Sequence, residues 1–202
     1  MTLEANRKEI ERHIELLTQP WKDASLVAHS EIRCLKENSG SRSILFNPLD
    51  DDETDETVSN LIRLNEVGWN CYICVNPIDP DHRAPARDRD IITAFYTFID
   101  ADDENAANNI SQSPLLPDFC VQTGTIPEKR MHAYWSLSDV PSLEEWSEVQ
   151  SKMIGYFGSD PAIKNPSRIM RMAGTISYPK EDKISRGYIP EITHLVEYSN
   201  EI

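Results

Sequence analysis

Residues 95–103 read FYTFIDADD, an apolar run of β-favouring residues that ends abruptly in carboxylates. Side chains alternate between the two faces of a β-strand, so Asp100 and Asp102 point the same way while Ala101 points the other way. Two carboxylates on one face at the end of a buried strand repel each other and are costly to remove from water. A divalent cation would relieve that cost, and carboxylate oxygens are the ligands that Mg²⁺ prefers. The stretch therefore predicts a metal site, although the same D-x-D pattern also occurs in phosphatases, glycosyltransferases and solvated loops.

The length and composition are those of an ordinary globular protein. The chain has 202 residues, of which 39% are hydrophobic, and this length suits one domain or two tightly joined halves. No run approaches the roughly 18 apolar residues that span a bilayer. The charged N-terminus, residues 1–15, also lacks the apolar centre of a signal peptide. We therefore expect a cytoplasmic protein without a membrane partner.

The charge of the chain is unevenly distributed. A net charge of −14 argues against a protein that coats nucleic acid non-specifically, because phosphate contacts need basic side chains. Between residues 164 and 186, however, the only acids are Glu181 and Asp182. The bases of that segment are Lys164, Arg168, Arg171, Lys180, Lys183 and Arg186. This segment is a local basic surface at which an acidic protein could still bind phosphate groups.

Hydrophobic spacing and turn signals predict a chain of mixed helices and strands. Ile10, Ile14 and Leu17 predict a surface helix over residues 3–18 that stops at Pro20. Strands are predicted at residues 31–35, 43–46, 69–75, 118–123 and 188–198, with helices after the acidic run 50–56 and from 142 to 158. The buried face of the last helix is predicted from Trp146, Val149, Met153 and Tyr156.

Residues 128–137 predict a strand with strict polar and apolar alternation. The polar face would carry Arg130, His132, Tyr134 and Ser136. A lone histidine on a strand is usually a hydrogen-bonded surface group. With Arg130 on the same face and Lys129 beside it, an anion-binding role for His132 becomes competitive.

Several motifs of known chemistry are missing. There is no G-x-x-x-x-G-K-[ST] phosphate loop, no G-x-S-x-G and no H-E-x-x-H, which argues against P-loop, serine hydrolase and zincin chemistry. The C-x-x-C at Cys71 and Cys74 has no second Cys or His pair at zinc-binding spacing, so we expect structural, reduced cysteines. The Arg-rich loop 76–90 is long enough to be functional, but its arginines are at least as well explained as salt-bridged surface residues.

The order of these features resembles the archaeo-eukaryotic primase superfamily, in particular the primase-polymerases of plasmids and phages. The family's first motif is a hydrophobic strand ending in D-x-D, matched by residues 98–102. Its second motif is a small residue, any residue and then His on a strand; His132 fits, but Arg130 stands where a small residue is common. Its third motif is a single acid, matched by Asp160. The most specific match is residues 165–175, NPSRIMRMAGT, with Lys180 near the place of a following lysine.

The resemblance implies an α+β fold with the archaeo-eukaryotic primase core. A single catalytic domain, residues 1–202, would comprise an N-terminal α/β unit over approximately 1–90 and an RRM-like antiparallel-sheet unit over 91–202, with the active site in the cleft between them. The implied activity is that of a DNA primase or primase-polymerase, a template-directed nucleotidyltransferase in plasmid or phage replication. Its implied partners are single-stranded DNA template, nucleoside triphosphates and a replicative helicase on the same or another chain.

The resemblance also implies roles for individual residues. Asp100, Asp102 and Asp160 would bind two divalent cations, Mg²⁺ or Mn²⁺, and would be catalytic. The residues expected to contact the incoming nucleotide are His132, Arg130, Arg168, Arg171 and Lys180, and those expected to contact template are Arg83, Arg87 and Lys129. The chemistry of the residues agrees, since nucleotidyl transfer uses two metals about 3.5–4 Å apart and cationic donors that face the phosphates.

Two other functions use the same residues. A metal-dependent nuclease or phosphatase would need the same acids, although Asp103 and the mid-chain position of Asp100 do not fit the usual phosphatase D-x-D. A non-catalytic RRM-like nucleic-acid-binding module would bind without metal and would leave the three acids without a purpose.

Overall fold

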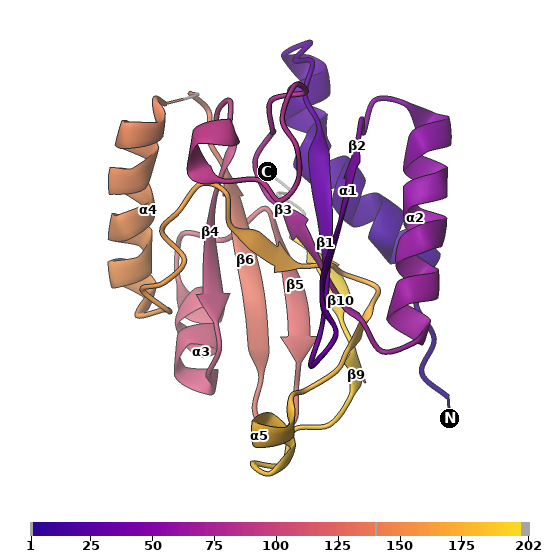
Figure 1. Cartoon of the computed structure of the whole chain (residues 1–202). Coiled ribbons are helices and arrows are strands. Elements are labelled where there is room, and N and C mark those ends of the chain that lie inside the picture. The colour runs from indigo at the N-terminus through magenta and orange to yellow at the C-terminus, as the bar shows by residue number, and fades with distance from the viewer. Residues whose placement is uncertain (1, 140, 199–202) are drawn as a thin grey trace.

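The computed structural model describes residues 2–139 and 141–198, which form two four-stranded antiparallel sheets with helices around them (Figure 1). The first sheet has the strand order β2-β1-β3-β7, the second has the order β10-β5-β6-β4, and β8 pairs with β9. The strands are β1 Ser30–Lys36, β2 Gly40–Phe46, β3 Asn70–Cys74, β4 Tyr96–Ala101, β5 Phe119–Gly124, β6 Arg130–Ser136, β7 Ile169–Arg171, β8 Ile176–Ser177, β9 Glu191–Ile192 and β10 His194–Glu197. The helices are α1 Arg7–Asp23, α2 Asp51–Glu66, α3 Glu104–Gln112, α4 Leu143–Phe157 and α5 Glu181–Ile184, with a 3₁₀ turn η1 at Asp88–Asp90. This is the mixed α+β architecture that the sequence predicts.

The first sheet combines strands from distant parts of the chain. Strands β1 and β2 form a hairpin across a turn in which Asn38 and Gly40 have positive φ angles of 60° and 84°. Strand β7, from the C-terminal part of the chain, pairs with β3 in the register Tyr72 to Arg171. The sheet therefore draws its strands from both sides of residue 90.

Helix α1 is longer than the predicted helix 3–18, and Pro20 lies inside it. Proline has no N–H, so the helix loses the hydrogen bond to the carbonyl four residues earlier. That carbonyl belongs to Leu16, and the hydroxyl of Tyr96 donates to it at 2.7 Å. A tertiary hydrogen bond thus replaces the missing helical one, which explains why the prediction of a stop at Pro20 is wrong.

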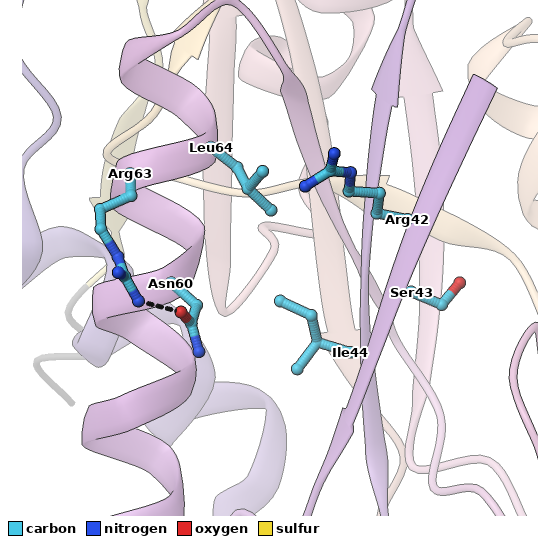
Figure 2. Close-up of a pocket in the computed structure, with 6 residues that line it drawn as sticks. All are labelled: Arg42, Ser43, Ile44, Asn60, Arg63 and Leu64. Carbon is cyan, nitrogen blue, oxygen red and sulfur yellow. Dashed lines mark hydrogen bonds between the residues drawn. The ribbon is translucent and has the colours of Figure 1, made fainter. Parts of the chain in front are cut away.

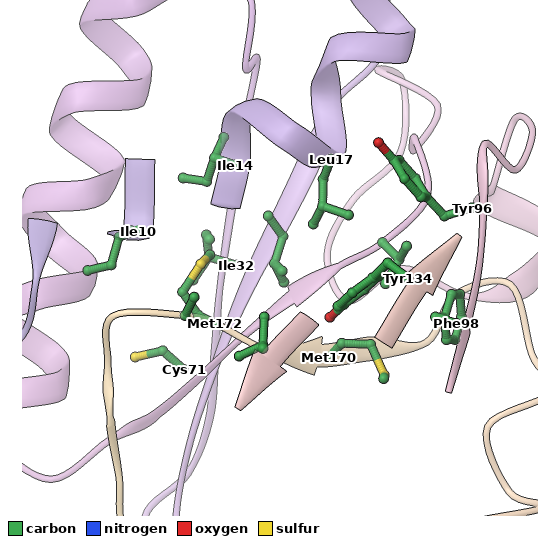
Figure 3. Close-up of a cluster of buried hydrophobic side chains, with 14 of the residues drawn as sticks. Ile10, Ile14, Leu17, Ile32, Cys71, Tyr96, Phe98, Tyr134, Met170 and Met172 are labelled. Carbon is green, nitrogen blue, oxygen red and sulfur yellow. The ribbon is translucent and has the colours of Figure 1, made fainter. Parts of the chain in front are cut away.

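The main core lies under α1 and joins the two sheets (Figure 3). Ile10, Ile14 and Leu17 of α1 pack over Ile32 of the first sheet and Tyr134 of the second. Tyr134 is fully buried, so the predicted polar face of β6 is not a solvent face. Tyr134 belongs to this core, with His132 and Arg130 on one side of it along the face and the exposed Ser136 on the other.

Helices α3 and α4 cover the opposite face of the second sheet, where they enclose a smaller apolar core (Figure 1). The buried face of α4 differs from the prediction, because Tyr156 is exposed and Gln150 is fully buried. The Gln150 amide bonds to the side chain of Thr97, to both backbone groups of Phe98 and to the carbonyl of Ile163. These bonds fix α4 against β4 at a position that a search for apolar spacing does not find.

Glu31 of β1 is a buried carboxylate with a full set of partners. It accepts two hydrogen bonds from Arg33 at 2.8 Å, one from the Ser43 hydroxyl at 2.6 Å and one from the Ala86 N–H at 2.9 Å. Burial raises its pKa, but these donors outweigh that effect and hold the pKa below its usual value. Glu31 thereby ties the loop after β3 to the first sheet.

None of the helices in the described part of the chain is long and apolar enough to cross a membrane. The four cysteines are buried and free, which confirms that the C-x-x-C is reduced.

Candidate active site

The strands β4 and β6 bring the predicted acid and histidine together. Asp100 and His132 are directly opposite each other in the antiparallel register of these strands. Both side chains lie on the face that carries Phe98 and Tyr134 further along, at the end where that face changes from apolar to polar. His132 Nε2 is 3.4 Å from Asp100 Oδ1.

Strand β7 orients the histidine from the other sheet. The backbone N–H of Arg171 donates to His132 Nδ1 at 3.2 Å. Because Nδ1 is the acceptor in this bond, the proton of the neutral imidazole is on Nε2 and faces Asp100. The first sheet thus sets the direction of a side chain in the second sheet.

A cavity of about 290 Å³, which we call the acid cavity, surrounds this pair. Its lining comprises Leu35, Tyr72, Asp100, Asp102, Thr123, Arg130, His132, Arg168, Ile169, Met170, Arg171, Ser177 and Lys183. A neighbouring cavity of about 310 Å³ shares five of these residues, namely Tyr72, Arg130, Arg171, Ser177 and Lys183. The two cavities therefore adjoin, and strands of both sheets contribute to their walls.

Asp100 is buried but poorly satisfied. Oδ1 is shielded from solvent, and the nearby donor, His132 Nε2 at 3.4 Å, is too poorly aligned to hydrogen-bond it; no other donor in residues 2–139 or 141–198 does so. Burial raises the pKa of Asp100, but the interaction with His132 and the positive charges of Arg171 and Arg168 outweigh burial and bring the pKa below its ordinary value. A buried carboxylate oxygen without a donor, beside an open cavity, is suited to a cation.

Asp102 follows the end of β4 and lies at the exposed side of the same cavity. Partial desolvation and then repulsion from Asp100 raise its pKa. This is the like-charge repulsion that the sequence predicts for the D-x-D pair, and a bound divalent cation would remove it.

Four cationic side chains face the two carboxylates, and they differ in how firmly they are held. Arg171 stacks over the Tyr72 ring at 4.7 Å and donates to the Tyr72 hydroxyl and to Asn70. Arg130 donates to Glu191 at 3.1 Å and to backbone carbonyls, and it stacks over the Tyr188 ring at 4.4 Å. The donors of Arg130 are thus largely committed within the protein.

Arg168 and Lys183 have no acidic partner in the described part of the chain, although the Lys183 ammonium lies 5.3 Å from the centroid of the Tyr188 ring. Among the described residues, no carboxylate lies within ion-pair distance of either side chain. Lys183 also lines both cavities and attracts the charge of Asp102. These two cations remain available for an anionic ligand.

Asp160 lies beside Asp100 through the backbone, since its N–H donates to the Asp100 carbonyl at 3.5 Å. Its carboxylate Oδ1 accepts the N–H of Ala162 at 2.9 Å and so closes a local turn. Asp160 is not part of the acid-cavity lining. Within the described residues, no group of three or more His, Cys, Asp or Glu side chains is arranged to hold a metal ion. Asp100 and Asp102 are therefore the acids that the fold brings to one cavity.

The other predicted residues lie further out. Lys180 lines the neighbouring cavity but not the acid cavity. Arg83, Arg87 and Lys129 line neither cavity.

The sequence did not single out Tyr72, Thr123, Ser177 and Lys183, which also line the acid cavity. The signal for Lys183 was its place in the basic segment 164–186. Tyr72 gave a weaker signal, since it alternates with Cys71 and Ile73, which are buried in the core.

Comparisons with known proteins support the fold. No protein-family model and no curated protein matches the chain. Among solved structures, the archaeo-eukaryotic primase (AEP) domain of the cyanophage S-2L primase-polymerase superposes with a TM-score of 0.63 at 22% identity, covering 98% of this chain and 93% of that domain. Primase RepB′ gives a TM-score of 0.59 at 16% identity, covering 91% of this chain and 56% of that one. The catalytic domain of primase RepB′ in complex with initiator DNA gives 0.55 at 16% identity, covering 81% of this chain and 77% of that one.

These likenesses show that the chain has the fold of archaeo-eukaryotic primase and primase-polymerase domains. They confirm, at the level of the fold, the resemblance that the sequence motifs predict.

Proposed function

We propose that this protein is a template-directed nucleotidyltransferase, a DNA primase or primase-polymerase that joins nucleoside triphosphates on single-stranded DNA. The observation that carries the proposal is the acid cavity, in which a buried carboxylate oxygen without a donor faces four cationic side chains. The primase-like fold makes this chemistry a natural one for the cavity.

Asp100 and Asp102 are the residues that would hold the divalent cations, Mg²⁺ or Mn²⁺. The donor set fits, because hard cations prefer carboxylate oxygens and accept water or phosphate oxygens at their remaining positions. When bound, two such cations stabilise the attacking 3′-oxygen and the leaving pyrophosphate. Asp160 is a candidate third ligand, because its backbone contacts Asp100, but its carboxylate would have to act in addition to closing its own turn.

The cations of the cavity would bind the triphosphate of the incoming nucleotide. Arg168 and Lys183 have uncommitted donors, and Arg171 presents its guanidinium from a fixed position on Tyr72. His132 directs its Nε2 proton into the same space and can donate to a phosphate oxygen. Arg130 lines both cavities and adds positive charge, while Lys180 would act in the neighbouring cavity.

The template would lie along the adjoining cavities, in a cleft between an N-terminal unit of approximately residues 1–90, whose sheet is completed by β7, and a catalytic unit formed by the rest of residues 91–202. One structural neighbour is a primase catalytic domain in complex with initiator DNA, which supports DNA as the partner class. Arg83, Arg87 and Lys129 are candidates for outer contacts with that strand. A replicative helicase, on this or another chain, would supply the single-stranded template.

The proposal is tested by incubating the protein with a labelled single-stranded template, nucleoside triphosphates of both sugar types, and Mg²⁺ or Mn²⁺. Synthesis of new strands or extension of a primer is expected, and it should be lost in Asp100→Asn. Independently of activity, Mn²⁺ should raise the melting temperature of the wild-type protein but not of Asp100→Asn, because a ligand that binds only the folded state stabilises it.

Other outcomes would point to the rival functions. Shortening of the labelled strand, or release of inorganic phosphate without synthesis, would indicate a nuclease or phosphatase. Binding of the template that is indifferent to metal, with no synthesis by the wild-type protein, would indicate a non-catalytic binding module.

A further inference from the structure

A third cavity, of about 660 Å³, lies between β2 and α2 and has no part in the proposed reaction (Figure 2). Its lining consists of Arg42, Ser43, Ile44, Asn60, Arg63 and Leu64. Arg42 and Ile44 lie on the face of the first sheet opposite Leu35 and Tyr72, which line the acid cavity, so the sheet separates the two sites. We call the third cavity the β2 groove.

The β2 groove combines an apolar centre with a basic rim. Ile44 and Leu64 are half-buried and face each other across the groove in Figure 2. The Arg42 guanidinium is 4.8 Å from the Trp69 ring centroid, which holds the arginine at the rim. Arg63 on α2 is bonded to the neutral side chain of Asn60.

The two arginines are not neutralised by the protein itself. In the part of the chain that the structure describes, no carboxylate lies within ion-pair distance of Arg42 or Arg63. Arg7, Arg12, Arg33, Arg89, Arg130 and Arg186 each have an acidic partner, whereas Arg83, Arg87, Arg168 and Arg171 also lack one among the described residues. In a chain with a net charge of −14, two arginines without an acid in one groove point to an external carboxylate.

The backbone beside the groove is also open. Strand β2 is the edge of its sheet and pairs only with β1. An edge strand presents unpaired N–H and C=O groups, to which an extended peptide can add as a further strand.

We propose that the β2 groove binds an extended, acidic segment of a partner protein, which adds to β2 as a strand. A carboxylate of the added segment, opposite Arg42 on β2, would pair with that arginine. Two residues further along the segment, an apolar side chain would lie against Ile44 and Leu64. A second acid of the segment would reach Arg63. Ser43 points to the other face, where it bonds to Glu31, so alternate side chains of the segment would not enter the groove.

The surroundings favour this occupant over two others. A nucleic-acid strand would meet the acidic first half of α2, which carries Asp51, Asp52, Glu53, Asp55 and Glu56, and its repeated phosphates would be repelled. A second copy of the chain, paired through β2 about a two-fold axis, would add a second Arg42 to the same edge and would provide no acid for either arginine. A short segment with two acids and one apolar residue avoids both problems.

The test uses a fluorescent, end-blocked peptide with the core Asp-Thr-Val-Thr-Asp, which reads the same in both directions and so suits parallel or antiparallel addition. Its binding to the full chain is measured by anisotropy. A matched peptide with Asn in place of Asp and a 15-nucleotide oligothymidylate are run beside it. The protein variants are Arg42→Glu/Arg63→Glu and, as a control for charge, Arg89→Glu at an exposed position outside the groove.

The acidic peptide should bind the wild-type and Arg89→Glu proteins at least tenfold more tightly than it binds the double variant. The affinity of the wild-type protein for the Asn peptide should be as low as that of the double variant for the acidic peptide. Amide NMR signals of residues 40–46 and 60–64 should shift with peptide. The proposal is overturned if the peptide does not bind at millimolar concentration, if the double variant binds it equally well, or if the shifts lie elsewhere. It is also overturned if the double substitution weakens the oligonucleotide and not the peptide. The double variant should keep the melting temperature and the strand synthesis of the wild-type protein. A failure of the peptide to bind would then count against the groove proposal alone and not against the proposed function.

Discussion

Two buried carboxylates, Glu31 in the first sheet and Asp100 in the second, have opposite surroundings. Glu31 is completely enclosed and accepts four hydrogen bonds from three residues. Asp100 borders a cavity, and its Oδ1 has His132 Nε2 at 3.4 Å but no aligned hydrogen-bond donor among the described residues. The pKa of each carboxyl lies below its ordinary value.

The difference shows that burial and a lowered pKa do not by themselves mark a functional acid. Both acids share those properties, and both have an arginine or histidine nearby. What separates them is the number of donors that the protein supplies, since a fully satisfied carboxylate has no capacity for a ligand. Substitutions at the two acids and at their neighbours test this distinction.

The largest effect is expected for Asp100→Asn, which removes a cation ligand and keeps the shape of the side chain. Strand synthesis should fall on the order of 10³-fold or more, equivalent to about 4 kcal/mol, while the melting temperature without metal stays the same or rises. The matched control is Asp103→Asn, because Asp103 caps α3 through the Ala106 N–H and asparagine can do the same. Equal losses in both variants would contradict the assignment of Asp100.

Glu31→Ala should instead lower the stability of the protein and leave its activity nearly unchanged. Removing one partner of a buried ion pair leaves the other charge uncompensated, so the free energy of unfolding should fall by about 3 kcal/mol. Urea denaturation measures this loss. At urea concentrations too low to unfold the protein, the specific activity should stay within a factor of about two of wild type. A loss of activity comparable to that of Asp100→Asn would contradict the distinction between the two acids.

His132→Gln tests the neighbour of Asp100. Glutamine can still accept the Arg171 N–H, but it does not reproduce the imidazole Nε2 donor, so synthesis should fall on the order of 10²-fold. The unfolding free energy should change by no more than about 1 kcal/mol. A purely structural role would instead be seen as a loss of stability with unchanged activity.

A smaller effect separates the two lysines near the cavities. Lys183→Ala should weaken the use of nucleotide about tenfold, seen as a raised KM, because Lys183 lines the acid cavity. Lys180→Ala should change KM less, since Lys180 reaches only the neighbouring cavity. A larger effect at Lys180 would favour the lysine that the family motif predicts.

The smallest effect is on the pH dependence of stability. The lowered pKa of Glu31 means that its stabilising contribution is fully present above its ordinary value of 4.5 and is lost as the pH falls through the folded-state value. Wild-type protein should therefore lose stability more steeply than Glu31→Gln as the pH is lowered below 4.5, by at most about 1.4 kcal/mol per pH unit. Denaturation curves between pH 5 and pH 3 measure the two slopes, and parallel slopes would contradict the shift.

Much of the candidate site could be predicted from local patterns. Strand alternation put Asp100 and Asp102 on one face and His132 on a matching face, and the basic segment 164–186 contained Arg168 and Arg171. These predictions succeed because the alternation of a strand is a local property of the chain.

The remaining features depend on contacts between distant residues. The sequence does not show that Tyr96 compensates for Pro20, that Gln150 fixes α4, or that Glu191 occupies the donors of Arg130. Asp160 differs, because its carboxylate closes a local turn with the Ala162 N–H, and its role as a metal ligand stays a prediction. For Tyr96, Gln150 and Glu191, the hydrogen-bond partner lies far away in the sequence, and only the fold identifies it.

The three-residue strand β7 has a consequence for the order in which the protein forms. It completes the first sheet next to β3 and, through the Arg171 N–H, orients a histidine of the second sheet. Its partners Tyr72 and His132 precede it by 99 and 39 residues, so these contacts carry a large loop-closure cost and should form late in folding. During synthesis, a nascent chain that has not yet released β7 from the ribosome has its acids but not an oriented histidine. On the proposed function, nucleotidyl transfer would thus begin only after β7 has paired with β3.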